Sequence, residues 1–486
     1  MMSSIARFSI VVFALSCASL SGSLASAQEY KSDPGFVQAV NLFELWADAQ
    51  RAYGQIPGVS VGIVHDQDMA WSGGFGYAHM DRETPTTPET IHSICSISKL
   101  FTSIAVMQLR DTGKLRLDDA AELHLPWFDI QRTHPEFGPV TVEGILTHSS
   151  GLPRESDFPY WSAPDHVFPT SEQIIEGLSE QETLYPASEY YQYSNLGMSL
   201  AGQIVESASG ISYAQYVTEN ILEQLGLEHT SPEMPERHRG NLLATGYSAQ
   251  NRQGERIETP FFQARGVASA AGYASNVNDL GRFASWQFRL LETGEGGVLD
   301  RNTLREMQRV HWTDFSSARG LGFSVSQRDE KTFVGHGGSC PGYRTTLTLQ
   351  LDEKLAAIAM INASGENPSL FANAAYDVIG AAIVSALESP GKTKPADPTL
   401  AMYTGTYTSG YGGETEVIPW DGSLATVSFP TENPLRSLSK LEHVGEHTFR
   451  RIRDDGELAE AVTFEVDADG SVVRMWRNSQ HRPKVR

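Results

Sequence analysis

Cysteine is scarce in this sequence: three cysteines occur among 486 residues. So few exclude a disulfide-stapled scaffold and a cysteine-rich zinc site. Basic residues are also in deficit, because 37 Lys and Arg stand against 59 Asp and Glu and leave a formal net charge of -22. That charge repels phosphate backbones and anionic membranes, so we expect no nucleic-acid partner.

Long apolar runs are missing too. No later stretch approaches the roughly 20 apolar residues of a transmembrane helix, so we expect no integral membrane segment. The N-terminus carries Arg7, a short apolar run over 10–15 and the pattern Ala25-Ser26-Ala27, which together are typical of a secretory signal peptide. We therefore expect residues 1–27, with Cys17, to be removed and the protein to be periplasmic or secreted.

Motifs for metal chemistry are absent from the sequence. It has no His-Glu-x-x-His and no paired ligand spacing among its 14 histidines, so we expect no metal and no cofactor. A Gly-x-Ser-x-Gly pattern surrounds Ser60, but a nucleophile elbow needs a strand, a sharp turn and a helix. Here Ile63 and Val64 simply continue a strand, so we interpret Ser60 as structural.

Hydrophobic periodicity predicts an α+β fold for residues 28–390. Helical spacing over 36–47 and 370–387 predicts terminal helices, and two β-hairpins are predicted over 59–64 with 69–77 and over 345–351 with 355–361. Residues 96 to about 310 have a pattern of helices and loops. The economical arrangement is an antiparallel sheet flanked by terminal helices, with a helical insertion between the hairpins.

The C-terminal part has a different pattern. Residues 391–398 are rich in proline and turn residues and have no apolar periodicity, which is typical of a linker. Beyond the linker, short alternating runs predict strands over 403–407, 423–429, 448–452, 461–466 and 471–476. Their spacing predicts a small antiparallel β-barrel or sandwich over 399–486.

The first chemical motif is Ser96-x-x-Lys99, which opens an amphipathic helix. A spacing of three puts both side chains on one helix face, where a lysine of lowered pKa can activate the serine. Two other pairs share this spacing, Ser389 with Lys392 and Ser437 with Lys440, but no amphipathic helix follows either. The alternative for Ser96 is a helix cap beside a surface lysine.

Two further motifs follow. Tyr193-Ser194-Asn195 is the only Tyr-x-Asn in the chain, and the tyrosine could act as general base if Lys99 lowers its pKa. His336-Gly337-Gly338-Ser339 precedes a predicted strand, where the glycines allow close approach of a substrate and His336 could donate a hydrogen bond. The alternative for Tyr193 and Asn195 is an aromatic residue at a helix entrance with a helix-capping Asn. The alternative for the second motif is an ordinary glycine-rich turn.

In this order, the three motifs resemble those of the serine β-lactamase and penicillin-binding-protein superfamily. The stretches 56–61, 146–153 and 335–338 are similar to the class C β-lactamase-related branch, which includes D-aminopeptidases, D-Ala-D-Ala carboxypeptidases and esterases. The resemblance covers roughly residues 35–390.

The resemblance implies a role for each motif residue. Ser96 would be the acylated nucleophile, Lys99 its activator and Tyr193 the general base. Asn195 would bind the substrate amide, and the strand segment His336, Gly338 and Ser339 would line the substrate. The backbone N–H groups of Ser96 and Ser339 would form the oxyanion hole.

His336 departs from the pattern, because class C β-lactamases carry lysine at this place. Neutral histidine attracts a β-lactam carboxylate less strongly. We therefore expect a secreted serine hydrolase that acts through an acyl-enzyme on a small-molecule or peptide substrate, as a D-amino-acid peptidase or an esterase. The alternatives are a β-lactamase or D-Ala-D-Ala carboxypeptidase, and a binding protein with a disused site. The sequence does not indicate an oligomeric state.

Other residues near the motifs leave choices open. We expect Cys95 and Cys340 to pack as two small buried residues, since a bridge beside the nucleophile demands a narrow Cα separation, although an oxidising compartment permits a disulfide. Phe158, Tyr160, Trp161 and Phe168 either wall the pocket or anchor a long loop. Tyr343 and Arg344 lie close enough to His336 to contact substrate; the alternative for Arg344 is a solvated side chain.

Overall fold

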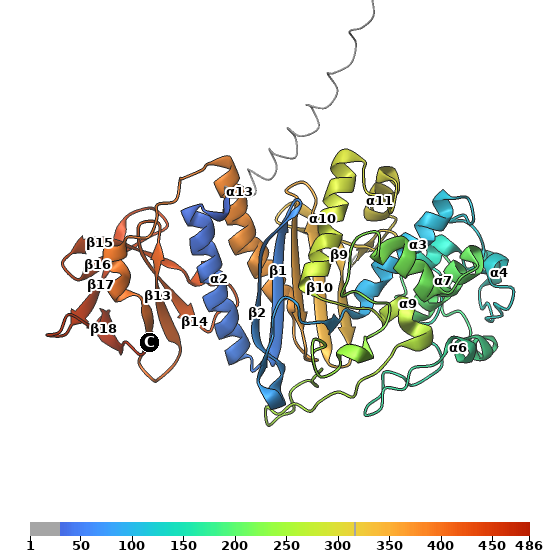
Figure 1. Cartoon of the computed structure of the whole chain (residues 1–486), viewed down its shortest axis with the longest axis horizontal. Coiled ribbons are helices and arrows are strands. Elements are labelled where there is room, and N and C mark those ends of the chain that lie inside the picture. The colour runs from blue at the N-terminus through green and yellow to red at the C-terminus, as the bar shows by residue number, and fades with distance from the viewer. Residues whose placement is uncertain (1–29, 315–316) are drawn as a thin grey trace, which may run out of the picture. The chain divides into compact units, whose positions relative to one another are not determined.

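The computed structural model describes residues 30–314 and 317–486, so the expected signal peptide lies outside the described residues. The chain divides into two compact units (Figure 1). One unit comprises Phe43–Gly380 with Pro430–Glu432. The other comprises the described residues up to Leu42 with Ala381–Phe429 and Asn433–Arg486. The expected linker at 391–398 stays a prediction.

A nine-stranded antiparallel sheet is the centre of the larger unit. Its strand order is β3-β2-β1-β11-β10-β9-β8-β7-β6. The bounds are β1 (Gly58–His65), β2 (Asp68–His79), β3 (Thr84–Pro85), β6 (Trp312–Thr313), β7 (Ala318–Arg319), β8 (Ser324–Arg328), β9 (Lys331–Cys340), β10 (Tyr343–Gln350) and β11 (Leu355–Ile361). Both predicted hairpins, β1 with β2 and β10 with β11, are confirmed. Because β1 pairs with β11, with Val59 opposite Ile361, two segments far apart in sequence share one sheet.

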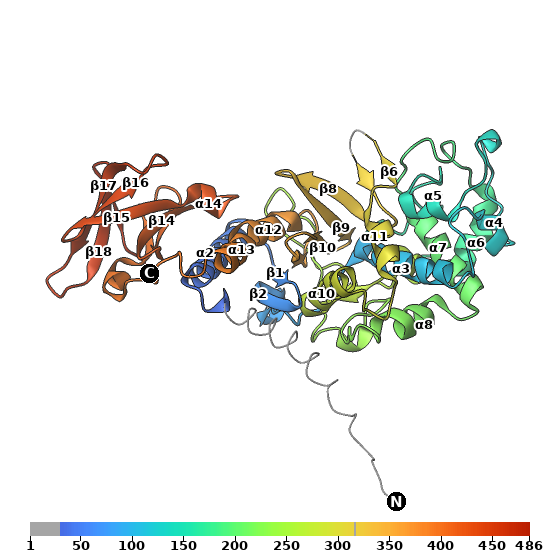
Figure 2. The ribbon, with the colours of Figure 1, turned by 90° about the horizontal axis from the view of Figure 1, so that it is seen from above.

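Helices cover both faces of this sheet (Figure 2). Gly62 in β1 faces Val277 of α10 (Val277–Thr293), and the next residue, Ile63, contacts Gly380 beyond α12 (Pro368–Ala375). Successive strand residues point to opposite faces, so α10 and α12 lie on opposite sides. The second half of α2 (Pro34–Tyr53) lies on the α12 side, where Trp46 packs against Phe371. A strand covered on both faces explains the nearly continuous apolar sequence of β1.

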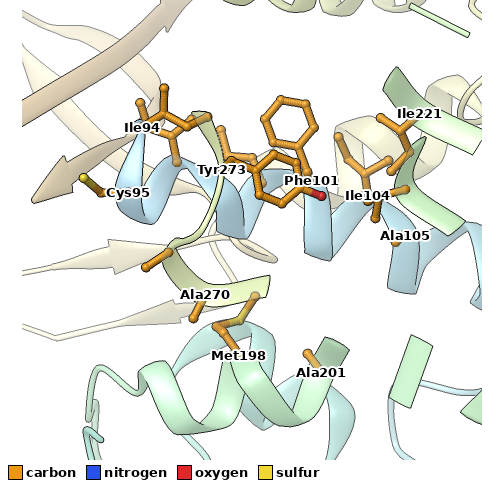
Figure 3. Close-up of a cluster of buried hydrophobic side chains, with 14 of the residues drawn as sticks. Ile94, Cys95, Phe101, Ile104, Ala105, Met198, Ala201, Ile221, Ala270 and Tyr273 are labelled. Carbon is orange, nitrogen blue, oxygen red and sulfur yellow. The ribbon is translucent and has the colours of Figure 1, made fainter. Parts of the chain in front are cut away.

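The helical insertion packs around α3 (Ser98–Asp111) and α7 (Asn195–Ser209) (Figure 3). Phe101 of α3 stacks on Tyr273 at 4.9 Å and on Phe283 at 4.7 Å, between ring centroids. The remaining elements are α4 (Ala121–His124), α5 (Val142–Thr147), α6 (Ser171–Gly177), α8 (Tyr213–Val217), α9 (Ala268–Ala271), α11 (Arg301–Gln308), β4 (His92–Ser93) and β5 (Ala274–Ser275). This core fixes the first turn of α3 and confirms the predicted fold class.

One helical stretch, Pro368–Glu388, is long and apolar enough to cross a membrane by length and composition. It contains α12, a π-helical turn over Tyr376–Gly380 and α13 (Ala381–Glu388). In the folded chain 56% of its most apolar window is buried, as in a core helix of a globular protein.

The smaller unit contains an eight-stranded antiparallel sheet that nearly closes into a barrel. Its strands run in sequence order: β12 (Gly405–Thr408), β13 (Glu414–Trp420), β14 (Ser423–Phe429), β15 (Ser439–Gly445), β16 (Thr448–Ile452), β17 (Leu458–Val466), β18 (Val472–Arg477) and β19 (Gln480–Pro483). The chain end closes the ring: the N–H of Thr406 donates to Arg486 O at 3.0 Å, and that of Val485 donates to Thr406 O at 2.8 Å. The predicted C-terminal barrel is thus confirmed.

Candidate active site

Ser96 lies in the 3-10 turn Cys95–Ile97 that leads directly into α3. Cys95, the residue before it, has a φ of 50°, in the left-handed region that non-glycine residues rarely adopt. Such conformations persist only where the surroundings enforce them, and they cluster at functional sites. The turn therefore presents Ser96 under strain at the N-terminal end of a buried helix.

Lys99 lies beneath Ser96 and is fully buried. Its Nζ lies 2.8 Å from Asn195 Oδ1, 2.8 Å from Ala270 O and 3.2 Å from Ser96 Oγ. Burial lowers the pKa of Lys99 well below its ordinary value, and the nearby Glu155 carboxylate only partly opposes this shift. Nζ thus donates to the carbonyl oxygens of Asn195 and Ala270 and to Ser96 Oγ, and these three hydrogen bonds fix the amine beside the serine.

Tyr193 completes the group, because its hydroxyl donates to Ser96 Oγ at 2.9 Å. Burial raises the pKa of Tyr193, and Lys99 Nζ lies over the tyrosine ring, 4.7 Å from its centroid. The expected lowering of the pKa of Tyr193 by Lys99 is not seen, because burial is the largest influence on Tyr193 and raises its pKa. Tyr193 is therefore a neutral phenol around neutral pH.

Two residues that sequence reasoning missed hold this group in place. Glu155 accepts from Asn195 Nδ2 at 2.8 Å, which turns the amide oxygen toward Lys99. His148 Nδ1 accepts from the N–H of Ser194 at 3.2 Å, and its ring packs 4.3 Å from that of Tyr193. Burial lowers the pKa of His148, so this contact adds no charge. The stretch 146–153, which resembles the family, contains His148 and was the available signal.

The strand segment His336–Ser339 forms one wall of the site. Strand β8 pairs with β9 only as far as Ser324 opposite Gly335, so no described strand covers that edge of β9 from His336 onward. A Cβ at Gly338 would lie 2.3 Å from the carbonyl oxygen of Ile94. Glycine at 338 thus lets the turn that carries Ser96 lie against the strand that carries Ser339, as the predicted oxyanion hole requires.

His336 cannot donate to a substrate carboxylate in the way the sequence suggested. Burial lowers its pKa to about 3, so the ring is neutral. Its Nδ1 lies 2.6 Å from the carbonyl oxygen of Gly337, which can only accept, so the single ring proton is on Nδ1. Nε2 then carries a lone pair and can only accept a hydrogen bond.

Cys95 and Cys340 form a disulfide, with their Cα atoms 5.7 Å apart. The expectation of two unbridged thiols is therefore wrong. The close contact of the Ser96 turn with β9 at Gly338 brings the two backbones within the range that a disulfide needs. The bridge joins the residue before Ser96 to the residue after Ser339.

A cleft of about 970 Å³ opens above these residues. It is lined by Ser96, Tyr193, Asn195, His336, Gly338 and Ser339, so the structure brings these predicted site residues together around one space, with Lys99 buried beneath Ser96. Three arginines also line it: Arg154, Arg319 and Arg344.

Of the other residues that the sequence suggested for the pocket, some line the cleft and the rest are buried in the core. Trp161 lines the cleft, whereas Tyr160 and Phe168 are buried and pack against it and each other, and Phe158 packs on the same core. The aromatic loop is therefore mainly anchored, with one ring exposed to the site. Tyr343 is buried and donates to Ala244 O at 2.7 Å, away from the cleft.

Among the described residues, no group of three or more His, Cys, Asp or Glu side chains lies together in a way that could hold a metal ion.

The family of the chain follows from comparison with known proteins. The family model described as "Beta-lactamase" matches residues 43–382, more than half of the chain. The protein belongs to this family, within the serine β-lactamase and penicillin-binding-protein superfamily, and has its serine hydrolase fold. The resemblance inferred from the motifs is confirmed.

Curated relatives match over part of their length. "Protein flp" of Staphylococcus aureus (strain MW2) is 29% identical over 197 residues, 40% of this chain and 39% of the relative. "Beta-lactamase-like protein 2" of Dictyostelium discoideum is 28% identical over 324 residues, 65% of this chain and 58% of the relative. The chain thus spans well under two thirds of either relative.

Solved structures share the fold. The octameric penicillin-binding protein homologue from Pyrococcus abyssi has a TM-score of 0.62 at 25% identity, and the match covers 92% of this chain and 100% of that chain. The D-stereospecific amidohydrolase from Streptomyces sp. has a TM-score of 0.56 at 20% identity, over 72% of this chain and 98% of that chain.

Proposed function

We propose that this protein is a serine hydrolase that forms an acyl-enzyme at Ser96 with peptide, amide or ester substrates. The observation that carries the proposal is the environment of Lys99. Nζ is fully buried and hydrogen-bonded to Ser96 Oγ and to the carbonyl oxygens of Asn195 and Ala270. Burial lowers the pKa of Lys99, and in our proposal the amine loses its proton, keeps its two carbonyl partners and turns its lone pair to Ser96 Oγ. A binding protein with a disused site would have no need of a buried lysine in this arrangement.

Acylation starts with transfer of the Ser96 hydroxyl proton to Lys99 as Oγ attacks the substrate carbonyl. The oxyanion that forms is stabilised by the backbone N–H groups of Ser96 and Ser339, and this contact strengthens as charge develops. The proton then passes from Lys99 through the Tyr193 hydroxyl to the leaving group. Tyr193 stays neutral before and after the transfer, in agreement with its raised pKa.

Deacylation runs the same route in reverse. A water molecule replaces the leaving group and loses a proton through Tyr193 to Lys99, and its hydroxide attacks the acyl carbon. Ser96 Oγ leaves and takes the proton back from Lys99. Glu155 and His148 are positioning residues in this scheme, because they hold Asn195 and Tyr193.

We favour the D-amino-acid peptidase or esterase type over a true β-lactamase. The neutral ring of His336 stands where class C β-lactamases carry a lysine, so this strand offers no cation to a β-lactam carboxylate. The similarity of fold to a D-stereospecific amidohydrolase is consistent with this choice. A β-lactamase or D-Ala-D-Ala carboxypeptidase is the second candidate. We also propose a periplasmic or secreted location, which the Cys95–Cys340 disulfide supports.

A fluorophosphonate probe tests the proposal directly. We expect wild type to be labelled at Ser96, and Ser96→Ala to take up no label. Ser326→Ala is the control, because Ser326 is an exposed serine of β8 that does not line the cleft. Equal labelling of wild type and Ser96→Ala would contradict the proposal. Hydrolysis of a chromogenic cephalosporin near the encounter limit, faster than that of a p-nitrophenyl ester, would favour the β-lactamase candidate.

A further inference from the structure

The C-terminal barrel has a small pocket of its own, with a volume of about 170 Å³. The strand register places its lining on the inner side of the barrel. Thr415 of β13 lies opposite Tyr407, and Arg482 of β19 lies opposite Met475. Tyr407 and Met475 belong to the barrel core, and residues directly opposite each other point to the same face of a sheet. An eight-stranded barrel is just wide enough to hold one small ligand inside.

The lining of this pocket is mainly polar. Val462 and Met475, which belong to the barrel core, form its apolar part. Hydroxyl and guanidinium groups dominate the rest of the lining, from Thr415, Thr426, Ser428, Arg477 and Arg482. No carboxylate lines the pocket in the part of the chain that the structure describes. Packing alone would favour apolar side chains at inward positions, since a partly buried charge is costly unless another group pairs with it.

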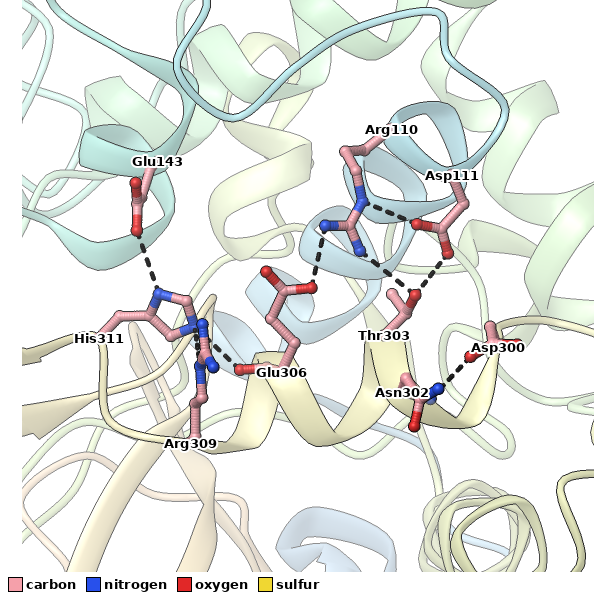
Figure 4. Close-up of polar contacts among 9 residues, drawn as sticks. All are labelled: Arg110, Asp111, Glu143, Asp300, Asn302, Thr303, Glu306, Arg309 and His311. Atoms are coloured by element: carbon pink, nitrogen blue, oxygen red, sulfur yellow. Dashed lines mark hydrogen bonds and ion pairs between the residues drawn. The ribbon is translucent and has the colours of Figure 1, made fainter.

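Arg482 has a hydroxyl partner and no acidic one. Its Nη1 donates to Thr415 Oγ1 at 2.7 Å, and no carboxylate of residues 30–314 and 317–486 forms an ion pair with it. Arg110 of α3 shows the usual arrangement in this acid-rich chain, because it donates to Asp111 at 2.7 Å and to Glu306 at 2.9 Å (Figure 4). Arg482 therefore keeps donors that are free for a ligand.

Arg477 of the neighbouring strand β18 has to share its acidic partner. Its Nη2 donates to Glu460 Oε1 at 2.8 Å, and the same oxygen accepts from Arg451 Nε at 3.1 Å. The Nε of Arg477 is buried and has no hydrogen-bond partner. Two guanidinium groups thus share one carboxylate and Arg482 has none, so this end of the barrel has a surplus of positive charge although the whole chain has a net charge of -22.

We propose that this pocket binds a small oxyanion, the carboxylate of a small organic acid or a phosphate. The planar guanidinium group matches the geometry of both anions, and the hydroxyl groups of the wall add neutral hydrogen bonds. Pockets for drug-sized ligands have volumes of about 300–1,000 Å³, so a volume of about 170 Å³ selects a smaller ligand. All the lining residues belong to the smaller unit, so the proposal is independent of the proposed hydrolase activity.

Isothermal titration calorimetry of the whole protein with sodium malonate and, separately, with sodium phosphate tests the proposal at fixed ionic strength. We expect wild type to bind at least one of the two anions. Arg482→Gln and Arg477→Gln should each raise Kd about 10- to 100-fold, the range for a charge-assisted hydrogen bond. Arg450→Gln is the control for the change in net charge, because Arg450 is an exposed arginine of β16 that does not line the pocket. It should change Kd less than about threefold, as expected where no such bond is lost.

Binding of malonate alone that depends on the two arginines would identify a carboxylate ligand, and such binding of phosphate alone a phosphate ligand. The proposal is overturned if neither anion binds. It is also overturned if Arg482→Gln and Arg477→Gln bind as tightly as wild type, because the anion then lies elsewhere, as in the catalytic cleft.

A milder variant covers the case in which the arginine variants do not fold. Thr426→Val keeps the shape of the side chain and removes a hydroxyl that lines the pocket. It should raise Kd about 3- to 10-fold, the range for a neutral hydrogen bond. An unchanged Kd in this variant, with both arginine variants unfolded, would count against the site.

Discussion

At the scale of single residues, the burial of Lys99 governs the chemistry of the site. A lysine that is fully buried without an ion pair loses its proton more readily, because burial disfavours the charged form. The same burial raises the pKa of Tyr193 and lowers that of His336 to about 3. Burial thus disfavours the charged form of all three groups, whereas the three arginines that line the cleft keep their positive charge.

This burial has a consequence for stability that Lys99→Met should reveal. Between the lowered pKa of folded Lys99 and the unfolded value of about 10.4, the unfolded chain binds a proton that the folded chain does not. Stability of wild type then rises with pH across that window. The free energy of unfolding of wild type minus that of Lys99→Met should rise by up to about 1.4 kcal/mol per pH unit.

Urea unfolding at about pH 7 and about pH 9 measures this difference. His336 is present in both proteins, so its own titration cancels. A difference that does not change with pH would mean that Lys99 keeps its proton in the folded protein, and Lys99 could not then be the base.

The sequence predicted the residues that the structure brings together around the cleft and missed those that hold them in place. Ser96 with Lys99 and Tyr193 with Asn195 are short-range patterns with few chance matches. Arg319 carries no such pattern: it lines the cleft because β7 pairs with β8, which depends on tertiary contacts. The roles of Glu155 and His148 likewise depend on partners about 40 or more residues away.

At the scale of elements, two backbone segments would form the proposed oxyanion hole, and the disulfide joins them. Cys95 lies in the turn before α3 and Cys340 at the end of β9, 245 positions apart in sequence. One bridge thus restrains both Ser96 and Ser339. Few local contacts could hold these two segments together with the same precision, since one is a strained turn and the other an open strand edge.

Replacing both cysteines in Cys95→Ala/Cys340→Ala should lower stability by about 2–5 kcal/mol and reduce kcat more than it raises KM. The reason for the kinetic split is that the oxyanion contacts act chiefly in the transition state. Denaturant unfolding measures the loss of stability, and ester kinetics measure the changes in kcat and KM. Intact-mass analysis of denatured wild type should show no alkylation at Cys95 or Cys340 before reduction and alkylation of both after it. Labelling of both without reductant would contradict the bridge.

Elements with strong periodicity were predictable and short edge elements were not. Strands β1 and β11 lie in the sheet interior, where burial on both faces favours long apolar patterns. Strands β6 and β7 have two residues each, too few to show alternation. In the barrel, β13, β15 and β19 were missed. Pro419 interrupts β13, and charged or polar side chains dominate β15 and β19.

At the scale of the whole molecule, each of the two compact units has its own aromatic core. In the barrel, Phe449 is fully buried and packs against Tyr403 and Phe464, with ring centroids 5.2 and 5.6 Å away. In the larger unit, Phe283 is fully buried and stacks on Phe101. Units with separate cores can unfold separately, so a substitution that makes a cavity in one core should destabilise only that unit.

We expect calorimetry to resolve two transitions and Phe449→Ala to destabilise one of them by about 3–5 kcal/mol, the usual cost of truncating a buried phenylalanine. Labelling of Ser96 by fluorophosphonate should be unchanged, because every residue that lines the cleft belongs to the larger unit. Phe283→Ala creates the matched cavity in the larger unit. It should lower the temperature of the other transition and slow the labelling of Ser96. The opposite result would be a single transition whose temperature falls in Phe449→Ala, together with slower labelling of Ser96. In that case the barrel is an integral part of the catalytic fold, and the two units do not act independently.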